Sequence, residues 1–147
     1  MMVTASIVLY KNDKKILLES IHSLLNSDIK EDCYLYLVDN SPTDELKNLI
    51  SHPKVEYIFN PSNPGFGAAH NIAIKKAIEG GSKYHLVLNP DVYFENTTID
   101  LLLKFMNDHP NVGNVMPKVL YPDGQVQYLC KFLPTPYDWI GRRFNPF

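Results

Sequence analysis

The sequence predicts an α/β protein with three layers, in which helices cover both faces of a mostly parallel central sheet. Two observations predict this class. Apolar strand-like runs alternate with helical patterns four times along the chain, as in βαβ units. The first run, Val3–Tyr10, is almost continuously apolar, as expected of a strand buried on both faces. The 147 residues suffice for one domain, which we place at residues 1–132, followed by a proline-rich arm at 133–147.

The predicted strands are short runs rich in β-branched and aromatic residues, and polar or proline-containing turns follow them. Four of them form the expected parallel sheet: Val3–Tyr10, Cys33–Val38, Val55–Phe59 and Tyr84–Leu88. A fifth strand is expected over Val112–Tyr121. The turn at Pro122-Asp123-Gly124 would pair it with Gln125–Phe132 as a hairpin.

Apolar residues at helical spacing predict a helix after each of the four strands. The first, third and fourth helices are marked by Leu17, Ile21, Leu24 and Leu25, by Ala69, Ile72, Ala73 and Ala77, and by Ile99, Leu102, Leu103 and Met106. The second is shorter, begins at Thr43 or Asp44 and ends at Ile50.

The helix ends carry recognisable residues. Asn12 or Asp13 can cap the first helix, and Gly80 with Gly81 would end the third. Thr97 and Asp100 resemble a capping box at the start of the fourth.

The composition argues against several classes of partner. A net charge of −2 gives no basic excess for nucleic acid. No apolar run approaches membrane-spanning length, and the N-terminus lacks the features of a signal peptide. Cys33 and Cys130 are expected to be free thiols in a reducing compartment. We therefore expect a cytoplasmic protein, and peripheral association with the inner face of the membrane stays open.

Polar residues follow each predicted strand. In a parallel sheet the carboxyl ends of the strands share one edge, where ligands bind in open α/β folds. These residues would line one crevice there: Lys11, Asn12, Asp39, Asn40, Asn60, Asn89 and Asp91.

Asn89-Pro90-Asp91 ends the fourth strand, because proline cannot donate to a sheet ladder. Its lone carboxylate suits a hard divalent cation that takes its other ligands from water and substrate phosphates. The alternative is an ordinary turn, since all three residue types favour turns.

Gly65 and Gly67 precede the third helix and allow two interpretations. They make a tight turn, or they let a ligand approach the backbone closely, with a phosphate at the helix N-terminus. They are not a dinucleotide fingerprint, because His70 occupies the third glycine position. His70 is itself a candidate ligand contact.

Four motifs occur in order between Val3 and about Tyr121: Ser6-Ile7-Val8-Leu9-Tyr10, Val38-Asp39-Asn40-Ser41-x-x-Asp44, Asn63-x-Gly65-Phe66-Gly67-Ala68-Ala69-x-Asn71 and Leu88-Asn89-Pro90-Asp91-Val92. Together they resemble family 2 glycosyltransferases, in particular the bacterial rhamnosyltransferase-like branch. The glycine segment and the Asn-Pro-Asp element, at this separation, make the resemblance fairly specific.

The resemblance implies the GT-A fold and transfer of a sugar, with inversion, from a dTDP- or UDP-sugar to a glycan or lipid-linked acceptor. Asn89-Pro90-Asp91 would stand for the DxD element of the family, with Asp91 binding Mg²⁺ or Mn²⁺ on the diphosphate. The donor site would comprise Tyr10, Asn12, Asp39, Asn63, Gly65, Gly67, Asn71, Asn89 and Asp91. Within it, the loop after Tyr10 and Asp39 would hold the base and ribose.

The chain departs from the family pattern in two places. Asn89 replaces the first acidic residue of the DxD element. In addition, neither Asp123 nor Asp138 lies in an acidic motif such as the one that supplies the general base. We therefore expect the donor-binding half of a longer enzyme.

Two other functions stay open at this point. One is a non-catalytic nucleotide-sugar-binding or assembly module, which would bind a donor without turnover. The other is a nucleotidyltransferase, although the loop Lys11–Lys15 lacks the glycines expected for it. Uncovered apolar surface would favour a homo-oligomer.

Overall fold

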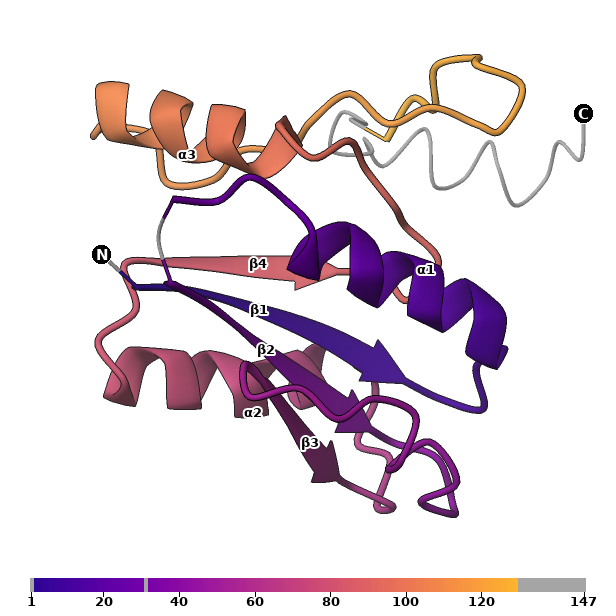
Figure 1. Ribbon diagram of the computed structural model, residues 1–147. Helices are drawn as coiled ribbons and strands as arrows, with labels where there is room; N and C mark the ends of the chain where they lie inside the picture. The colour runs from indigo at the N-terminus through magenta and orange to yellow at the C-terminus, as the bar shows by residue number, and fades with distance from the viewer. Residues whose placement is uncertain (1, 31, 130–147) are drawn as a thin grey trace, which may run out of the picture. The chain divides into compact units, whose positions relative to one another are not determined.

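A computed structural model describes residues 2–30 and 32–129 and shows the predicted α/β fold (Figure 1). One sheet contains β1 (Met2–Leu9), β2 (Asp32–Asp39), β3 (Val55–Phe59) and β4 (Tyr84–Leu88), in the order β3-β2-β1-β4. All three strand pairs are parallel. The helices are α1 (Lys14–Leu25), α2 (Phe66–Glu79) and α3 (Thr98–Asp108).

The predicted three layers are confirmed. Figure 1 shows α1 and α3 on one face of the sheet and α2 on the other. Because side chains alternate along a strand, β1 serves both faces. Ile7 and Leu9 pack with α1, whereas Val8 packs with Ala69 and Ala73 of α2.

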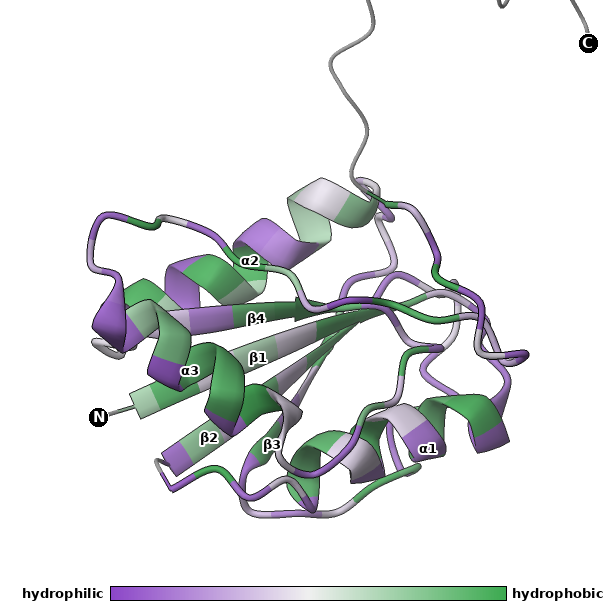
Figure 2. Cartoon of the chain, turned by 90° about the horizontal axis from the view of Figure 1, so that it is seen from above, coloured by the Kyte–Doolittle hydropathy of each residue, from purple (hydrophilic) through white to green (hydrophobic). Residues whose placement is uncertain are grey.

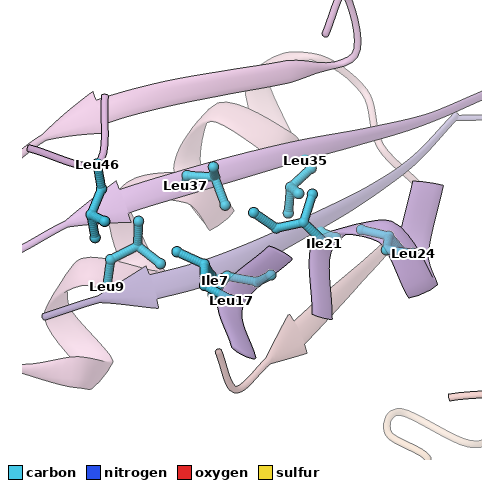
Figure 3. Packing of buried hydrophobic residues seen from close by; sticks show 9 residues of the cluster. Ile7, Leu9, Leu17, Ile21, Leu24, Leu35, Leu37 and Leu46 are labelled. Carbon is cyan, nitrogen blue, oxygen red and sulfur yellow. The ribbon is translucent and has the colours of Figure 1, made fainter. Parts of the chain in front are cut away.

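The main hydrophobic core lies between α1 and the sheet (Figure 3). Leu17, Ile21 and Leu24 of α1 are buried, as their helical spacing predicts. They pack with strand residues of β1 and β2 and with Leu46, which lies between β2 and β3: Ala5, Ile7, Leu9, Leu35 and Leu37 complete this cluster. Ile99 and Leu103 fix α3 against Val3 in a separate cluster.

The chain divides into two compact units, Met1–Val115 and Met116–Phe147, which are described separately. The second includes a turn closed by an isolated antiparallel bridge between Leu120 and Val126. The predicted boundary at residues 132 and 133, and the arm that follows it, lie outside the described residues.

Three predictions about elements are wrong. Val112–Tyr121 is not a continuous strand, because Gly113 and Pro117 interrupt it. Within the described residues the expected hairpin is short: Leu120 bridges Val126, Tyr121 N donates to Gln125 O, and Gln127 N donates to Val119 O. The expected helix ending at Ile50 is a run of turns, closed by three-residue hydrogen bonds such as that from Lys47 N to Asp44 O.

The third concerns the start of α3. Thr97 has helical backbone angles and its side chain makes no capping hydrogen bond, so the expected capping box does not form. By contrast, the Asp13 carboxylate accepts from the backbone N–H groups of Lys15 and Ile16 and caps α1, as predicted.

Candidate functional site

The four strands place their polar ends at one edge of the sheet. All four arrows in Figure 1 point the same way, so the segments that follow Leu9, Asp39, Phe59 and Leu88 leave from the carboxyl edge. Figure 2 shows long apolar stretches in the strands and hydrophilic segments in the loops beyond them. The convergence that the sequence predicts is therefore present.

Side-chain hydrogen bonds join three of these loops. Lys11 N, after β1, donates to Ser41 Oγ, after β2, at 2.8 Å. Asn60 Nδ2, after β3, donates to Asn40 Oδ1 at 2.8 Å. Asn40 Nδ2 in turn lies 3.5 Å from the carbonyl oxygen of Gly65, at the start of α2. The three strand ends and the α2 N-terminus thus form one connected polar structure.

Asp39 lies at the centre of this structure and is fully buried. Its Oδ1 accepts from Ser41 N at 2.8 Å, and its Oδ2 accepts from the Tyr57 hydroxyl at 2.6 Å. Burial and this hydrogen bond raise the pKa of Tyr57, which therefore stays a protonated donor. Asp39 holds the loop together, and direct contact of its carboxylate with a ribose stays a prediction.

The β1 loop presents an exposed aromatic ring. Tyr10 is half exposed, and its backbone N–H donates to Asn12 Oδ1 at 2.7 Å. Lys11 between them has a positive φ of 51°, a conformation that the Ser41 and Asn12 contacts support. The Lys11 ammonium lies 5.6 Å from the centroid of the Tyr10 ring, so this ring already has a cation beside it.

The two glycines of this segment differ in what the structure requires of them. Gly65 has a φ of 96°, which L side chains rarely adopt, so a glycine is needed at this turn. A Cβ at Gly67 would meet nothing within 4 Å, so packing does not require that glycine and the space beside it is open. The tight turn is confirmed for Gly65, and close approach of a ligand stays a prediction for Gly67.

The α2 N-terminus next to these glycines has free donors. Gly65 provides no side-chain cap, and the first turn contains no acidic residue. The first helical bond in this turn runs from Ala69 N to Gly65 O, so the earlier N–H groups have no partner within the helix. Asn63, with a φ of 43°, and Asn71 are both exposed, in the loop before α2 and within it.

Asn89 and Asp91 are exposed at the end of β4, next to the end of β1. The Asn89 carbonyl oxygen lies 3.4 Å from Ser20 Oγ of α1 and 3.4 Å from Val92 N, which closes the turn. Among residues 2–30 and 32–129, no cluster of three or more His, Cys, Asp or Glu side chains could hold a metal ion. A cation at Asp91 would thus take most of its ligands from water and phosphate oxygens.

His70 does not face the loops, contrary to its role as a candidate ligand contact. It lies on the buried, sheet-facing side of α2, where its Nδ1 lies 2.7 Å from Ser6 Oγ. Ser6 Oγ also lies 2.7 Å from His85 Nε2, and His85 Nδ1 lies 2.8 Å from Thr4 Oγ1. Burial lowers the pKa of both imidazoles, that of His85 to about 4, so both are neutral at pH 7.

The hydrogens of this network have one consistent order. Ser82 Oγ donates to the Tyr84 carbonyl oxygen, and Thr4 donates to Ser82. His85 must then donate from Nδ1 to Thr4, and Ser6 must donate to His85 Nε2. His70 consequently donates to Ser6 from Nδ1, which leaves its Nε2 as a buried acceptor without a partner among the described residues. The network is a structural support between β1, β4 and α2.

Sequence reasoning missed the partner of Asp39. Tyr57 lies within β3, opposite Leu37, two residues before the strand ends. An aromatic residue within a strand is ordinary, and only the pairing register shows that its hydroxyl can reach the carboxylate of Asp39 at the end of β2. The same limit applies to the Ser6–His70 contact, which joins residues 64 positions apart.

The parallel sheet, with helices on both faces and polar loops at its carboxyl edge, has the GT-A fold, which the solved structures described below share. Residues 6–137 match the family description "Glycosyl transferase family 2". The chain therefore belongs to glycosyl transferase family 2. The rhamnosyltransferase-like branch is not distinguished by this match.

Curated relatives agree with this family. The chain is 24% identical over 143 residues to the uncharacterised glycosyltransferase MJ1057 of Methanocaldococcus jannaschii, covering 94% of this chain and 48% of the relative. It is 29% identical over 119 residues to the low-salt glycan biosynthesis hexosyltransferase Agl10 of Haloferax volcanii, covering 80% and 36%. The chain thus spans about half or less of the length of these relatives.

Solved structures support the fold. Residues 1–349 of TarS from S. aureus superpose with a TM-score of 0.59 at 19% identity, covering 83% of this chain and 40% of that chain. The same protein in complex with UDP-GlcNAc gives a TM-score of 0.57 at 18% identity, covering 83% and 38%.

Proposed function

We propose that this chain binds the nucleotide diphosphate of an activated sugar at the carboxyl edge of its sheet, as the donor-binding part of a glycosyltransferase. The donor is a dTDP- or UDP-sugar. Tyr10, Asn12 and Asp39 shape the base and ribose pocket, and Asn63, Gly65, Gly67 and Asn71 line the diphosphate side. The reaction is transfer of the sugar, with inversion, to a glycan or lipid-linked acceptor.

One observation carries this proposal. The loops after β1, β2 and β3 are joined by hydrogen bonds between Lys11 and Ser41 and between Asn40 and Asn60, and a further contact reaches Gly65. The uncapped α2 N-terminus lies in the same structure and favours a phosphate. Hydrogen-bonded polar loops beside free N–H donors suit a nucleotide diphosphate better than they suit an apolar ligand.

The cation is assigned to Asp91 on the chemistry of the donors present. Asp91 is exposed, and Asn89, two residues earlier, offers an amide oxygen. A single carboxylate with an amide suits Mg²⁺ or Mn²⁺, which keep waters and bind phosphate oxygens. When bound, the cation would neutralise charge on the departing nucleotide diphosphate.

The experiment is calorimetric titration of UDP and dTDP into the protein, with and without Mn²⁺. The wild-type chain should bind at least one nucleotide, more tightly with Mn²⁺. Asp91→Ala should abolish the Mn²⁺ enhancement, whereas Asp108→Ala, which removes an exposed carboxylate in the last turn of α3, should leave it unchanged. Absence of binding to both nucleotides by the folded wild-type chain would refute the proposal.

A second candidate is a donor-binding module without transfer activity. The observation that favours it is that neither Asp123 nor Asp138 lies in an acidic motif such as the one that supplies the general base in this family. Tight nucleotide binding without sugar release, in a panel of donors including dTDP-rhamnose and UDP-GlcNAc, would select this alternative. Release of the nucleotide with sugar transfer would select the enzyme.

The place of action follows from the donor. None of the helices within residues 2–30 and 32–129 has the length and hydropathy needed to cross a bilayer. We place the protein in the cytoplasm, and a lipid-linked acceptor would bring it to the inner face of the membrane. Co-sedimentation with lipid vesicles in the presence and absence of the acceptor would test that association.

A further inference from the structure

A groove outside the proposed donor site runs between α1 and the segment that follows β4. It is a shallow depression, wide open to solvent, with a volume of about 420 Å³. The lining residues are Glu19, His22, Ser23, Asn26, Tyr93 and Asn96. Glu19, His22 and Ser23 of α1 and its C-cap Asn26 follow the i, i+3, i+4, i+7 spacing, so they form a single stripe along the helix.

Hydrogen bonds connect the two sides of the groove, which are α1 with the residues after it and the segment that follows β4. Ser20 Oγ contacts the Asn89 carbonyl oxygen near one end, and Asp28 N donates to the Asn96 carbonyl oxygen at 2.9 Å near the other. Between them, Phe94 packs against the core clusters beneath α1 and α3. The segment is therefore held in place before any ligand arrives, which lowers the entropic cost of binding.

Tyr93 is the distinctive residue of this groove. Its neighbour Phe94 is directed into the core, while Tyr93 remains 67% exposed. Tyr93 belongs to none of the hydrophobic clusters, although its neighbour Phe94 packs against two of them. Packing in the core therefore does not explain why a tyrosine stands at this position. A flat aromatic face with a polar tip is the surface on which a sugar ring packs its C–H face.

The remaining lining residues define the chemistry of the ligand. Asn26 and Asn96 each offer donors and an acceptor, Ser23 offers a hydroxyl, and Glu19 accepts hydrogen bonds. No lysine or arginine lines the groove, and Glu19 brings negative charge, so a phosphate or a carboxylated chain is disfavoured. An uncharged ligand rich in hydroxyl groups fits this set.

We propose that the α1–Tyr93 groove binds a neutral oligosaccharide. Tyr93 lies two residues beyond Asp91 in the chain, so the groove is close to the proposed cation ligand. Naming this saccharide as the acceptor chain rests on the proposed function, whereas its binding to the groove does not. The groove holds the chain by one aromatic stack and several hydroxyl contacts.

The test is a titration followed by ¹H–¹⁵N NMR, without nucleotide. The probes are maltotetraose, cellotetraose and mannotetraose, with tetragalacturonate as the anionic comparison. At least one neutral probe should bind with Kd of about 1 mM and shift the amide signals of Tyr93 and Asn96. Tyr93→Ala should weaken binding about tenfold or more, and Tyr93→Phe, which keeps the ring, should restore most of it.

Two control variants separate this inference from the donor site and from general aromatic exposure. Tyr34→Ala, which removes a tyrosine of β2 that is 40% exposed, and Asp91→Ala should both leave oligosaccharide binding unchanged. Failure of every neutral probe to bind the folded protein at about 10 mM, equal binding by Tyr93→Ala, or tighter binding of tetragalacturonate would each overturn the inference. Oligosaccharide binding without nucleotide binding would overturn the proposed function alone.

Discussion

The Tyr57 hydroxyl is one of two donors to the buried carboxylate of Asp39, and its removal tests how firmly the β2 loop is held. Tyr57→Phe would leave Asp39 Oδ2 buried without that donor. Because an unsatisfied buried charge is costly, we expect the free energy of unfolding to fall by about 2 kcal/mol. Urea denaturation followed by circular dichroism measures the change.

Tyr34→Phe is the matched control for that experiment. Tyr34 lies on β2 and is 40% exposed, and its hydroxyl has no partner among the described residues. It should change the free energy of unfolding by less than about 0.5 kcal/mol. Equal effects of Tyr57→Phe and Tyr34→Phe would show that the 2.6 Å contact contributes nothing to stability.

The His85 imidazole gives the fold a defined pH dependence. Burial lowers the pKa of His85 to about 4, below its ordinary value of 6.5, so the native state favours the neutral ring. The resulting stability is complete above pH 6.5 and is lost as the pH falls towards 4. The shift corresponds to at most about 3 kcal/mol, measured as the free energy of unfolding between pH 7.5 and 4.

Replacement of the ring isolates this contribution from the carboxylates that also titrate. His85→Asn should be less stable than the wild type at pH 7.5, because it loses the bond to Ser6 or Thr4. The difference between the two proteins should shrink as the pH falls. A difference that stays constant from pH 7.5 to 4 would mean that His85 does not titrate with folding.

At the residue scale, the sequence predicts where a residue lies in the fold better than it predicts which side chains that residue contacts. Asp39 and Asn40 are predicted at the carboxyl edge of the sheet, and they are found there. Their burial and their partners are not predictable from the residues alone, because Tyr57 and Asn60 reach them only through the pairing of β2 with β3. His70 shows the converse error: proximity in sequence to Gly67 suggests a ligand contact, but the helical turn directs its side chain to Ser6.

At the element scale, the starts of α1 and α3 differ in a way that mutation can measure. The Asp13 carboxylate accepts two backbone N–H bonds at the start of α1, at 2.9 and 3.1 Å. Asp13→Ala should therefore lower the free energy of unfolding by about 1 kcal/mol. Thr97→Ala should change it little, because Thr97 makes no cap bond. Thermal denaturation of both variants shows whether stability depends on the capping hydrogen bonds seen in the structure or on the capping residues predicted from the sequence.

The two glycines before and within α2 provide a second element-scale test. Gly65→Ala forces an L side chain to a φ of 96° and should lower the free energy of unfolding by about 1–2 kcal/mol. Gly67→Ala meets no atom within 4 Å and improves helix propensity, so it should raise stability by about 0.5 kcal/mol. Chemical denaturation of the two variants measures both changes.

Gly67→Ala also distinguishes the two roles considered for this glycine. Under the proposed function, a methyl group in the open space beside α2 obstructs the diphosphate, so the variant should be more stable and yet bind UDP more weakly. Undiminished UDP binding by this variant would show that the glycine serves no ligand. Calorimetric titration at equal Mn²⁺ concentration provides the comparison.

A helix of this protein can be predicted from the sequence when apolar residues recur at regular spacing on one of its faces and that face is buried. The spacing of Leu17, Ile21 and Leu24 predicts α1, and all three residues are buried. The segment ending at Ile50 contains helix-compatible residues, but only Leu46 of it is buried in the core, so little tertiary packing stabilises a helix there. Val112–Tyr121 fails for a backbone reason, since Pro117 lacks the N–H that a paired strand needs.

At the scale of the whole molecule, parallel pairing explains why separate loops meet. Each βα unit returns the chain to the same side of the sheet, so alternation of strands and helices in the sequence is enough to predict a shared carboxyl edge. The order β3-β2-β1-β4 is a further fact that alternation does not determine. That order places the β4 end with Asp91 beside β1, and the β3 end with Asn60 at the far side.

The distribution of the core leads to a last prediction, on the extent of the folding unit. Among residues 2–30 and 32–129, the buried hydrophobic residues all lie between Val3 and Leu103, and the first compact unit ends at Val115. A chain of residues 1–115 should therefore unfold cooperatively, with a free energy of unfolding within about 1 kcal/mol of that of residues 1–132. Urea denaturation of both, beside the full chain, measures this. If residues 1–115 fail to fold while residues 1–132 do, the segment 116–132 belongs to the domain and the boundary predicted from the sequence is correct.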